Sequence, residues 1–491
     1  MHKYVARACV ATAAAVAVSS VGWTGASAAS MSSRVPRAVR APSARAARAP
    51  GGPGTQQWVK RYNGPGKGID DATSVAVSPD GKTVYVTGHS AAVGAAVVYD
   101  YATVAYNATT GAQQWVQRYN GPGNGDDLAN SVAVSPDGKT VFVTGSSYGG
   151  STTNYDYATV AYSAASGAQL WVKRYNGPAA GGADEATSAA ASPDGSTVYV
   201  TGYSYATATS SLDYATVAYN AATGAQRWVK RYNGGVGDDY AHSVAVSGST
   251  IYVTGVSRGT NDAFDYATVA YNAAGQQLWV KRYNGATTGQ RGANAVAVSR
   301  DGKAVYVTGS SYGGSTTNYD YATVAYNAAT GAQLWVKRYT SPGSGDDQAN
   351  SVAVSPTGNM VFVTGSSTGA GNLYDYATVA YNATTGQQVW VKHYNGALGL
   401  GDNQAFSVAV SPSGGTVYVT GSGDADSNYA TIAYNATNGT QQWAKRYTGS
   451  GPDGGGATWA AVSPTTGAVY VTGHSSGSGT GYDYATVAYQ G

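Results

Sequence analysis

Short runs of alternating apolar and polar residues recur along this chain, and each is bounded by glycine, proline, asparagine or aspartate. Within residues 131–175 the runs are SVAVS, TVFVTG, DYATVAY and QLWVKRY. A period of two over four to eight residues predicts β-strands. Residues 135–139, Ser-Pro-Asp-Gly-Lys, predict a tight hairpin because proline presets φ and glycine accepts a positive φ. We therefore expect four short antiparallel strands in this unit.

The same unit recurs eight times between residues 56 and 489, with a spacing of about 55 residues. Four strands in each of eight copies predict an all-β fold, an eight-bladed β-propeller with four antiparallel strands per blade. A solenoid is the alternative, but neither end of the array resembles the capping repeat that a stack needs. Each copy contains one tryptophan, and these are Trp58, Trp115, Trp171, Trp228, Trp279, Trp335, Trp390 and Trp443.

The two ends of the array are incomplete in a complementary way. The array opens with a fourth strand alone, residues 56–62, and closes with a third strand, residues 483–489. We expect the N-terminal strand to complete the last blade, beside residues 458–463, 468–473 and 483–489. Such closure would remove the open sheet edge that this blade otherwise has.

Residues 1–28 have the features of a signal peptide. Lys3 and Arg7 precede an apolar stretch, residues 8–22, and residues 26–28 form the small-residue pattern Ala-Ser-Ala. A membrane anchor is the alternative, but the stretch is short, and no later segment is apolar over the ~20 residues that a membrane span needs. We therefore expect a secreted, extracellular protein with no membrane span.

Residues 29–54 contain five arginines, four prolines and no acid, a composition typical of a disordered basic leader. The propeller then occupies residues 55–491, where 22 Lys and Arg residues stand against 26 acids. This balance implies no basic patch and argues against a nucleic-acid partner. The only cysteine, Cys9, lies within the signal, so we expect an exported monomer without disulfides or thiolate sites.

Two stretches of the repeat resemble known propeller families. Residues 105–121, AYNATTGAQQWVQRYNG, resemble the tryptophan-docking repeat of quinoprotein-type eight-bladed propellers, with Asn107 in place of the usual Asp. Residues 126–162 resemble the β-propeller repeats of secreted and surface proteins of bacteria. The first resemblance implies that Trp115 and its seven equivalents pack between blades as structural residues. An aromatic side chain that occurs once per blade favours the same interpretation.

Enzymes of the quinoprotein family hold a quinone over calcium with Glu, Asn and Asp side chains, often beside adjacent cysteines. Glu185 is the only glutamate of this chain, and the paired cysteines are missing. We therefore assign no cofactor-binding or catalytic residue. The histidines after the signal show no metal-binding spacing, and they are His89, His242, His393 and His474. His89 and His474 hold equivalent positions in the first and last blades, where either a metal or pH-sensitive site or neutral drift explains them.

Pairs of acids precede the first strand of most repeats. The structural interpretation, which we favour, is that aspartate caps the turns and accepts hydrogen bonds from backbone N–H groups. Calcium or glycan binding is the alternative, because carboxylate oxygens are calcium ligands. The candidate metal ligands are Asp70, Asp71, Asp126, Asp127, Asp238, Asp239, Asp346 and Asp347.

A second charge pattern links the fourth strand to the DYATVAY run. Each fourth strand except one carries an arginine, and about 38 residues later stands an aspartate, again with one exception. The exceptions, His393 and Asn428, coincide. We therefore expect ion pairs between adjacent blades, such as Arg118 with Asp156.

The paired acids and the hairpins between second and third strands are expected on one face, where the repeats vary most. Variable loops on a fixed scaffold usually carry binding. Here tyrosines can stack on sugar rings beside aspartates, and these are Tyr99, Tyr155, Tyr319 and Tyr374. The favoured hypothesis is a secreted, non-catalytic binding or structural propeller for a polysaccharide or a protein. The alternatives are a quinoprotein-like oxidoreductase and a calcium-dependent polysaccharide lyase or hydrolase.

Overall fold

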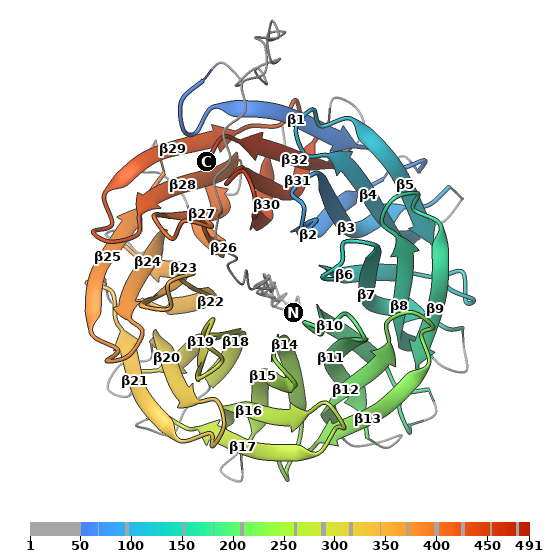
Figure 1. The fold of residues 1–491 in the computed structure, drawn as a ribbon, viewed down its shortest axis with the longest axis horizontal. Coiled ribbons are helices and arrows are strands. Elements are labelled where there is room, and N and C mark those ends of the chain that lie inside the picture. The colour runs from blue at the N-terminus through green and yellow to red at the C-terminus, as the bar shows by residue number, and fades with distance from the viewer. Residues whose placement is uncertain are drawn as a thin grey trace, which may run out of the picture.

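Eight four-stranded antiparallel sheets form a closed ring around a central axis (Figure 1). The described part of the chain contains strands and turns and no helix. The prediction of an eight-bladed β-propeller is therefore confirmed. The computed structural model describes residues 51–491 except 67, 94–97, 151–153, 180, 207–210, 260–262, 286–290, 314–317, 344, 370–372, 397–401, 424–427, 452–453 and 478–480.

Blades 1 to 7 follow one another along the chain, from β2–β5 to β26–β29, and blade 8 is β30–β32 with β1. The first strands lie nearest the centre of the ring, and they are β2 (Asp70–Val77), β6 (Asp127–Val134), β10 (Asp184–Ala191), β14 (Asp239–Ser247), β18 (Arg291–Val298), β22 (Asp347–Val354), β26 (Gln404–Val410) and β30 (Gly455–Val462). The second strands are β3 (Thr83–Ala91), β7 (Thr140–Tyr148), β11 (Thr197–Tyr205), β15 (Thr250–Arg258), β19 (Ala304–Tyr312), β23 (Met360–Thr368), β27 (Thr416–Gly423) and β31 (Val469–Ser476).

The third strands are β4 (Tyr99–Asn107), β8 (Tyr155–Ser163), β12 (Leu212–Asn220), β16 (Phe264–Asn272), β20 (Tyr319–Asn327), β24 (Tyr374–Asn382), β28 (Asn428–Asn435) and β32 (Tyr482–Tyr489). The fourth strands lie at the circumference and are β1 (Gln56–Tyr62), β5 (Gln113–Tyr119), β9 (Gln169–Tyr175), β13 (Gln226–Tyr232), β17 (Gln277–Tyr283), β21 (Gln333–Tyr339), β25 (Gln388–Tyr394) and β29 (Gln441–Tyr447).

Strand β1 closes the ring, as the sequence predicted. It pairs with β32 in antiparallel register, with Trp58 opposite Ala488. The fold extends one residue beyond the predicted boundary, because the Gly54 N–H donates to the carbonyl of Gln490 at 2.7 Å. Gly54 has a φ of 77°, and a Cβ there would lie 2.7 Å from Cγ of Trp443. Gly54 therefore belongs to the propeller and not to the leader.

The repeated tryptophan lies between neighbouring blades. Seven of the eight indole N–H groups donate to a backbone carbonyl of the next blade, at 2.9 to 3.0 Å. The acceptors are Ala108, Ala164, Ala221, Ala273, Ala328, Ala383 and Ala436. The eighth, Trp443, lies against Gly54, which precedes β1. Seven indoles thus combine apolar packing with a polar contact across the blade interface.

A tyrosine of the third strand connects every pair of neighbouring blades. Its hydroxyl donates to an alanine carbonyl of the next blade at 3.0 to 3.2 Å, in all eight interfaces. The pairs are Tyr101 with Ala158, Tyr157 with Ala215, Tyr214 with Ala267, Tyr266 with Ala322, Tyr321 with Ala377, Tyr376 with Ala430, Tyr429 with Ala485 and Tyr484 with Ala102. Burial raises the pKa of Tyr157 well above its ordinary value, so this hydroxyl stays a neutral donor.

The predicted signal peptide, residues 1–28, and most of the predicted leader, residues 29–54, lie outside the described residues. Both assignments, and secretion with them, stay predictions. Within the described part, no helix has the length and apolar character that a membrane crossing requires.

Removing β1 should destabilise the ring far more than removing the residues before it. A chain that starts at Asn63 loses the partner of β32 and the burial of Trp58, a loss of at least about 3–5 kcal/mol by analogy with buried aromatic truncations. A chain that starts at Gly51 keeps both. Thermal unfolding should show a lower melting temperature for the shorter chain alone. Equal melting temperatures would show that β1 is not a closing strand.

Candidate ligand-binding face

One face of the ring carries the loops before the first strands together with the hairpins between second and third strands; we call it the loop face. The two kinds of loop touch, because the Gly123 N–H donates to the Tyr148 carbonyl and the Gly66 N–H to the Ala91 carbonyl, both at 3.2 Å. The expectation that they share a face is confirmed. The opposite side, the turn face, carries the Ser-Pro-Asp-Gly and Thr-Gly turns.

The first set of acids is buried under the loop face. Each is at most 1% exposed, and one carboxylate oxygen accepts a backbone N–H from the preceding loop at 2.6 to 2.8 Å. In Asp70 the second oxygen accepts the Ala91 N–H at 3.1 Å. These carboxylates hold the loop onto the hairpin, as turn caps do. The set is Asp70, Asp127, Asp184, Asp239 and Asp347.

Burial raises the pKa of all five carboxyls, and the hydrogen bonds that they accept offset only part of this effect. The pKa of Asp127 rises to about 6. The backbone and Ser147 hydrogen bonds to Asp127 act in the opposite direction. The folded protein therefore holds this proton more tightly than an unfolded chain does.

A second set of acids crosses the blade interface. Each carboxylate accepts the N–H at the start of the third strand of the preceding blade, at 2.9 to 3.1 Å. The pairs are Asp126 with Tyr99, Asp238 with Leu212, Asp346 with Tyr319 and Asp402 with Tyr374. This contact fixes the backbone from which the loop-face tyrosines project.

The apparent pairs of acids thus combine three different positions. Asp71 and Glu185 follow the buried aspartate, whereas Asp126 precedes it, and they face different partners. Reading them as one repeated pair was wrong, because the second acid precedes the buried aspartate in some blades and follows it in others. At equal loop length, blade 1 has Ile69 where blade 2 has Asp126. Among the described residues, no three His, Cys, Asp or Glu side chains gather as a metal ion requires. Calcium binding by the eight candidate aspartates stays a prediction.

The arginines of the fourth strands do cross the blade interface, but through tyrosine. Arg118 Nη2 lies 2.9 Å from Asp100 Oδ2 of its own blade, and Nη1 donates to Tyr62 Oη of the preceding blade at 3.2 Å. The predicted pair of Arg118 with Asp156 is wrong, because Asp156 pairs with Arg174 of its own blade at 2.8 Å. The hairpin of third and fourth strands brings six of the seven arginines beside the aspartate of their own blade.

The coincidence of His393 and Asn428 therefore does not mark an ion pair across the interface, because the arginines of other blades pair within their own blade. His393 belongs to blade 6 with Asp375, and Asn428 belongs to blade 7 with Arg446. The two exceptions lie in different blades. The spacing of residues along the chain cannot show whether an arginine pairs with the aspartate of its own blade or with that of the next blade, because both spacings are constant.

Half-buried aromatic side chains stand where second and third strands meet the loop face. Two of these cross-strand positions hold tyrosine pairs, Tyr148 with Tyr155 and Tyr312 with Tyr319, whose ring centroids are 5.6 and 6.1 Å apart. In blade 4 the Arg258 guanidinium lies 6.0 Å from the Phe264 ring centre. The remaining aromatic members are Tyr99, Tyr205, Tyr374 and Tyr482. Blades 1 to 6 and blade 8 thus each present at least one ring.

The first and second strands carry a further cluster that sequence reasoning missed. Tyr203 donates to Glu185 Oε2 at 2.5 Å, and its ring lies 5.1 Å from that of Tyr240 in the next blade. Tyr240 in turn donates to Asp238 at 3.3 Å. The sequence signal for this cluster was a departure from the repeat: where blade 3 has Tyr203 and Glu185, blade 2 has Ser146 and Leu128.

The two equivalent histidines behave differently at the closing interface. His474 Nδ1 of blade 8 lies 3.3 Å from Asp71 Oδ1 of blade 1, whereas His89 is buried against Tyr99, with ring centroids 5.2 Å apart. His474 thus reaches across the interface that β1 closes, and His89 packs within its own blade. The suggested metal or pH-sensitive site at this position stays a prediction.

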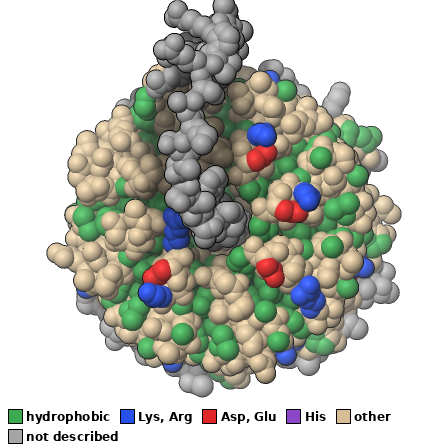
Figure 2. Space-filling view, viewed as in Figure 1, with side chains coloured by type: hydrophobic (Ala, Val, Ile, Leu, Met, Phe, Trp, Pro, Cys, Tyr) green, Lys and Arg blue, Asp and Glu red, His purple; other side chains and the backbone are tan. Residues whose placement is uncertain are grey.

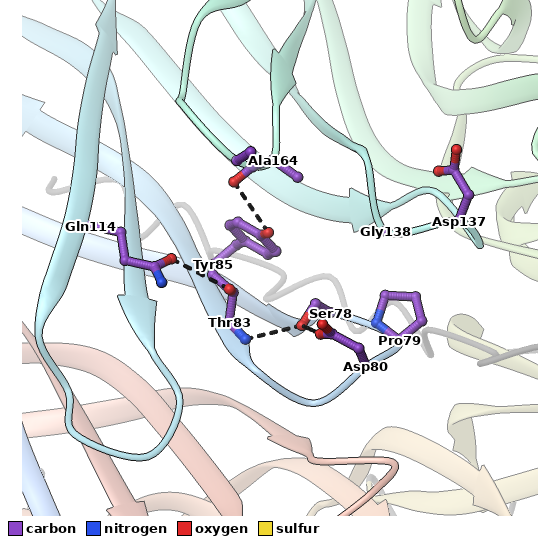
Figure 3. A pocket seen from close by; sticks show the side chains of 10 residues that line it. Ser78, Pro79, Asp80, Thr83, Tyr85, Gln114, Asp137, Gly138 and Ala164 are labelled. Carbon is purple, nitrogen blue, oxygen red and sulfur yellow. Dashed lines mark hydrogen bonds between the residues drawn. The ribbon is translucent and has the colours of Figure 1, made fainter.

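One hollow lies on the turn face. It measures about 470 Å³ and separates Thr83 and Tyr85 of blade 1 from Asp137 and Gly138 of blade 2 (Figure 3). Its polar groups complete the turns themselves: Ser78 Oγ donates to Asp80 at 2.6 Å, and the same contact recurs in later blades. Figure 2 shows charged side chains mostly in isolated pairs of opposite sign, without a large patch of one sign. Turn geometry explains this hollow without a ligand.

The ring of eight four-stranded blades, each with its tryptophan against the neighbouring blade, defines a repeat propeller of the quinoprotein-like class. Residues 47–213, 156–323 and 269–475 match the family described as outer membrane protein assembly factor BamB, and the chain belongs to this family. A comparison with curated proteins gives no significant match.

Solved structures with the same architecture include binding proteins and enzymes. Chaetomium thermophilum Sqt1, bound to the N-terminus of ribosomal protein L10, matches 89% of this chain over 100% of its own, at 15% identity and a TM-score of 0.59. Quinohemoprotein alcohol dehydrogenase from Comamonas testosteroni matches 88% of this chain over 76% of its own, at 11% identity and a TM-score of 0.53. A europium-containing methanol dehydrogenase matches 89% of this chain over 93% of its own, at 13% identity and a TM-score of 0.51. At these identities the similarity shows the fold alone.

The quinoprotein-like class raises the question of a quinone held over a metal ion. Such a site needs several carboxylate and amide oxygens that converge on one point. The described residues bring no three acidic or histidine ligands together, and Glu185 accepts from Tyr203 and from Asn130 Nδ2 at 3.3 Å. Within the described part of the chain, the residues therefore do not fit this group.

Replacing Asp156 by Asn should destabilise the protein, because Arg174 would keep a partly buried charge without its carboxylate. Hydrogen bonds to charged groups suggest a loss of about 1.5–3 kcal/mol. Asp137→Asn, which affects an exposed pair with Lys139, should cost less than about 1 kcal/mol. Urea unfolding of both variants measures the difference, and equal losses would contradict the assigned network.

Stability should depend on pH through Asp127. The folded carboxyl has a pKa of about 6 and an unfolded one about 3.9, so the free energy of unfolding should fall as the pH rises between these values, by at most about 3 kcal/mol. Asp127→Asn should reduce this dependence of the free energy of unfolding on pH. Chemical denaturation at pH 4, 5, 6 and 7 tests it, and parallel profiles for both proteins would refute the shift.

Proposed function

We propose that this protein is a secreted, non-catalytic propeller that binds polysaccharide on its loop face. The observation that carries the proposal is the ring of half-buried aromatic side chains there. Aromatic rings offer flat apolar faces with polar edges, which suit the C–H faces and hydroxyl groups of sugars. The neighbouring carboxylates supply hydrogen-bond acceptors for those hydroxyls.

The way these rings are held also favours binding. Three tyrosines, Tyr99, Tyr319 and Tyr374, have their backbone N–H fixed by an aspartate of the following blade. A platform that is already ordered loses little conformational entropy when a ligand arrives. Because the platforms repeat around the ring, one long chain can contact several of them, and linked contacts multiply the affinity.

A protein ligand is the alternative, since propellers with this architecture include Sqt1, whose solved structure holds the N-terminus of ribosomal protein L10. The aromatic rings and carboxylates of the loop face favour sugar over an acidic peptide, because an acidic peptide would bring like charges together. An oxidoreductase finds no support in the donor groups described above.

An array of homopolymers of glucose, galactose, mannose and N-acetylglucosamine tests the proposal, with and without calcium. The purified protein should bind at least one polymer. The triple variant Tyr155→Ala, Tyr319→Ala, Tyr374→Ala should bind at least about tenfold more weakly, since avidity is lost with each contact. Its melting temperature checks that the ring remains folded.

The matched control changes the turn face. Lys82→Ala, Lys139→Ala and Lys303→Ala remove three exposed charges and should leave polymer binding unchanged. Absence of binding to every polymer would refute the proposal, and so would equal losses in the control and tyrosine variants.

A further inference from the structure

One hollow on the loop face is bounded by two of the aromatic side chains. It lies between blades 1 and 2 and measures about 250 Å³. Pockets for drug-sized ligands measure about 300–1,000 Å³, so this one suits a single small unit. Its walls are Val98, Asn124, Gly125, Asp126, Tyr148 and Tyr155.

The aromatic wall is a corner made by two tyrosines. Tyr148 ends β7 and Tyr155 begins β8, where they face each other in register. Their ring planes meet at 60°, so one ring can stack on a flat ligand while the other closes the side. Both rings are only half buried, which leaves part of each for contact.

The loop before β6 supports this corner. A Cβ on Gly123 would lie 2.6 Å from Cδ1 of Tyr148, and one on Gly125 would lie 2.4 Å from the same atom. Only glycine therefore lets the ring lie against the loop. Asn124 between them has a φ of 48°, and its side chain accepts from Asn120 Nδ2 at 3.2 Å.

Asp126 supplies the polar wall. Its Oδ1 is held by the Tyr99 N–H at 3.1 Å, which fixes the carboxylate at the edge of the hollow. Burial raises the pKa of Tyr155, and the Asp126 carboxylate raises it further, so the phenol stays a neutral donor beside an acceptor. The described residues that line the hollow include no lysine or arginine.

We infer that this hollow is a subsite for one uncharged sugar ring, stacked on the tyrosine corner with a hydroxyl pair directed at Asp126. This inference rests on the proposed function and sharpens it. A uronate is disfavoured, because its carboxylate would face Asp126 without a compensating cation. The other aromatic positions act as platforms along a longer chain.

The chain contains its own comparison for this subsite. Residues 307–326 repeat residues 143–162 without a change, so blade 5 has the same tyrosine hairpin. The preceding loops differ, with NGPGNGDD at 120–127 and NGATTGQR at 284–291. Blade 5 thus has Thr288 and Gln290 where blade 2 has Asn124 and Asp126. The inference therefore assigns the subsite to the loop and not to the tyrosines alone.

Calorimetric titration of the whole protein with disaccharides of the four sugars, and with a digalacturonate, tests the inference. One neutral disaccharide should bind with a stoichiometry of one, and the digalacturonate at least about tenfold more weakly. Replacing residues 122–126 by the blade 5 sequence Ala-Thr-Thr-Gly-Gln should abolish disaccharide binding although both tyrosines remain. Asp126→Asn keeps the shape and should weaken binding at least about threefold.

Tyr319→Ala should weaken polymer binding while one disaccharide still binds. Disaccharide binding that survives the loop replacement, several equal sites per chain, or preference for the digalacturonate would each overturn the subsite, while polymer binding would still support the loop-face proposal. Binding of neither polymers nor disaccharides would overturn both. Circular dichroism and the melting temperature of each variant separate loss of binding from loss of fold.

Discussion

The hydrogen bond from a buried tyrosine to an alanine carbonyl of the next blade is the contact on which this ring depends. It is present at all eight interfaces, including the closing one from Tyr484 to Ala102. Losing one partner would leave a buried polar group unsatisfied, which costs about 1–3 kcal/mol. Because the bond lies in the third strand, near the middle of each blade, both faces are left free for other tasks.

A second layer of contacts connects the first strands around the centre of the ring. Each of these strands has a bulge, as between Ala72 and Ser74, and in seven blades the bulged residue donates to an alanine carbonyl of the next blade at 2.7 to 2.9 Å. In blade 7 the position is Phe406, next to the blade that β1 completes. Blade 8 has the bulky Trp459 where six blades have serine. The closing blade thus relies more on apolar packing than its neighbours do.

The fold followed from the sequence because each level of evidence agreed: strand period, turn residues, one tryptophan per unit and complementary ends. The site was harder to predict. Arg118 and Asp156 keep a constant spacing along the chain, and so do Arg118 and Asp100, so periodicity alone could not choose the partner. The acids before the first strands look like one repeated pair, although the second acid precedes the buried aspartate in blade 2 and follows it in blade 1. The contact between Tyr203 and Tyr240 joins two blades, and only the three-dimensional arrangement reveals it.

The central claim is that the uniform parts of the repeat build the ring and that its departures on the loop face bind the ligand. Hydrogen exchange of the backbone amides, with and without a bound polysaccharide, tests this most directly. The account predicts slower exchange in residues 120–126 and 148–150 when the polymer is present, and unchanged exchange in the turn-face hairpins at residues 78–83 and 135–140. Protection of the turn-face hairpins, with the loop face unchanged, would contradict it.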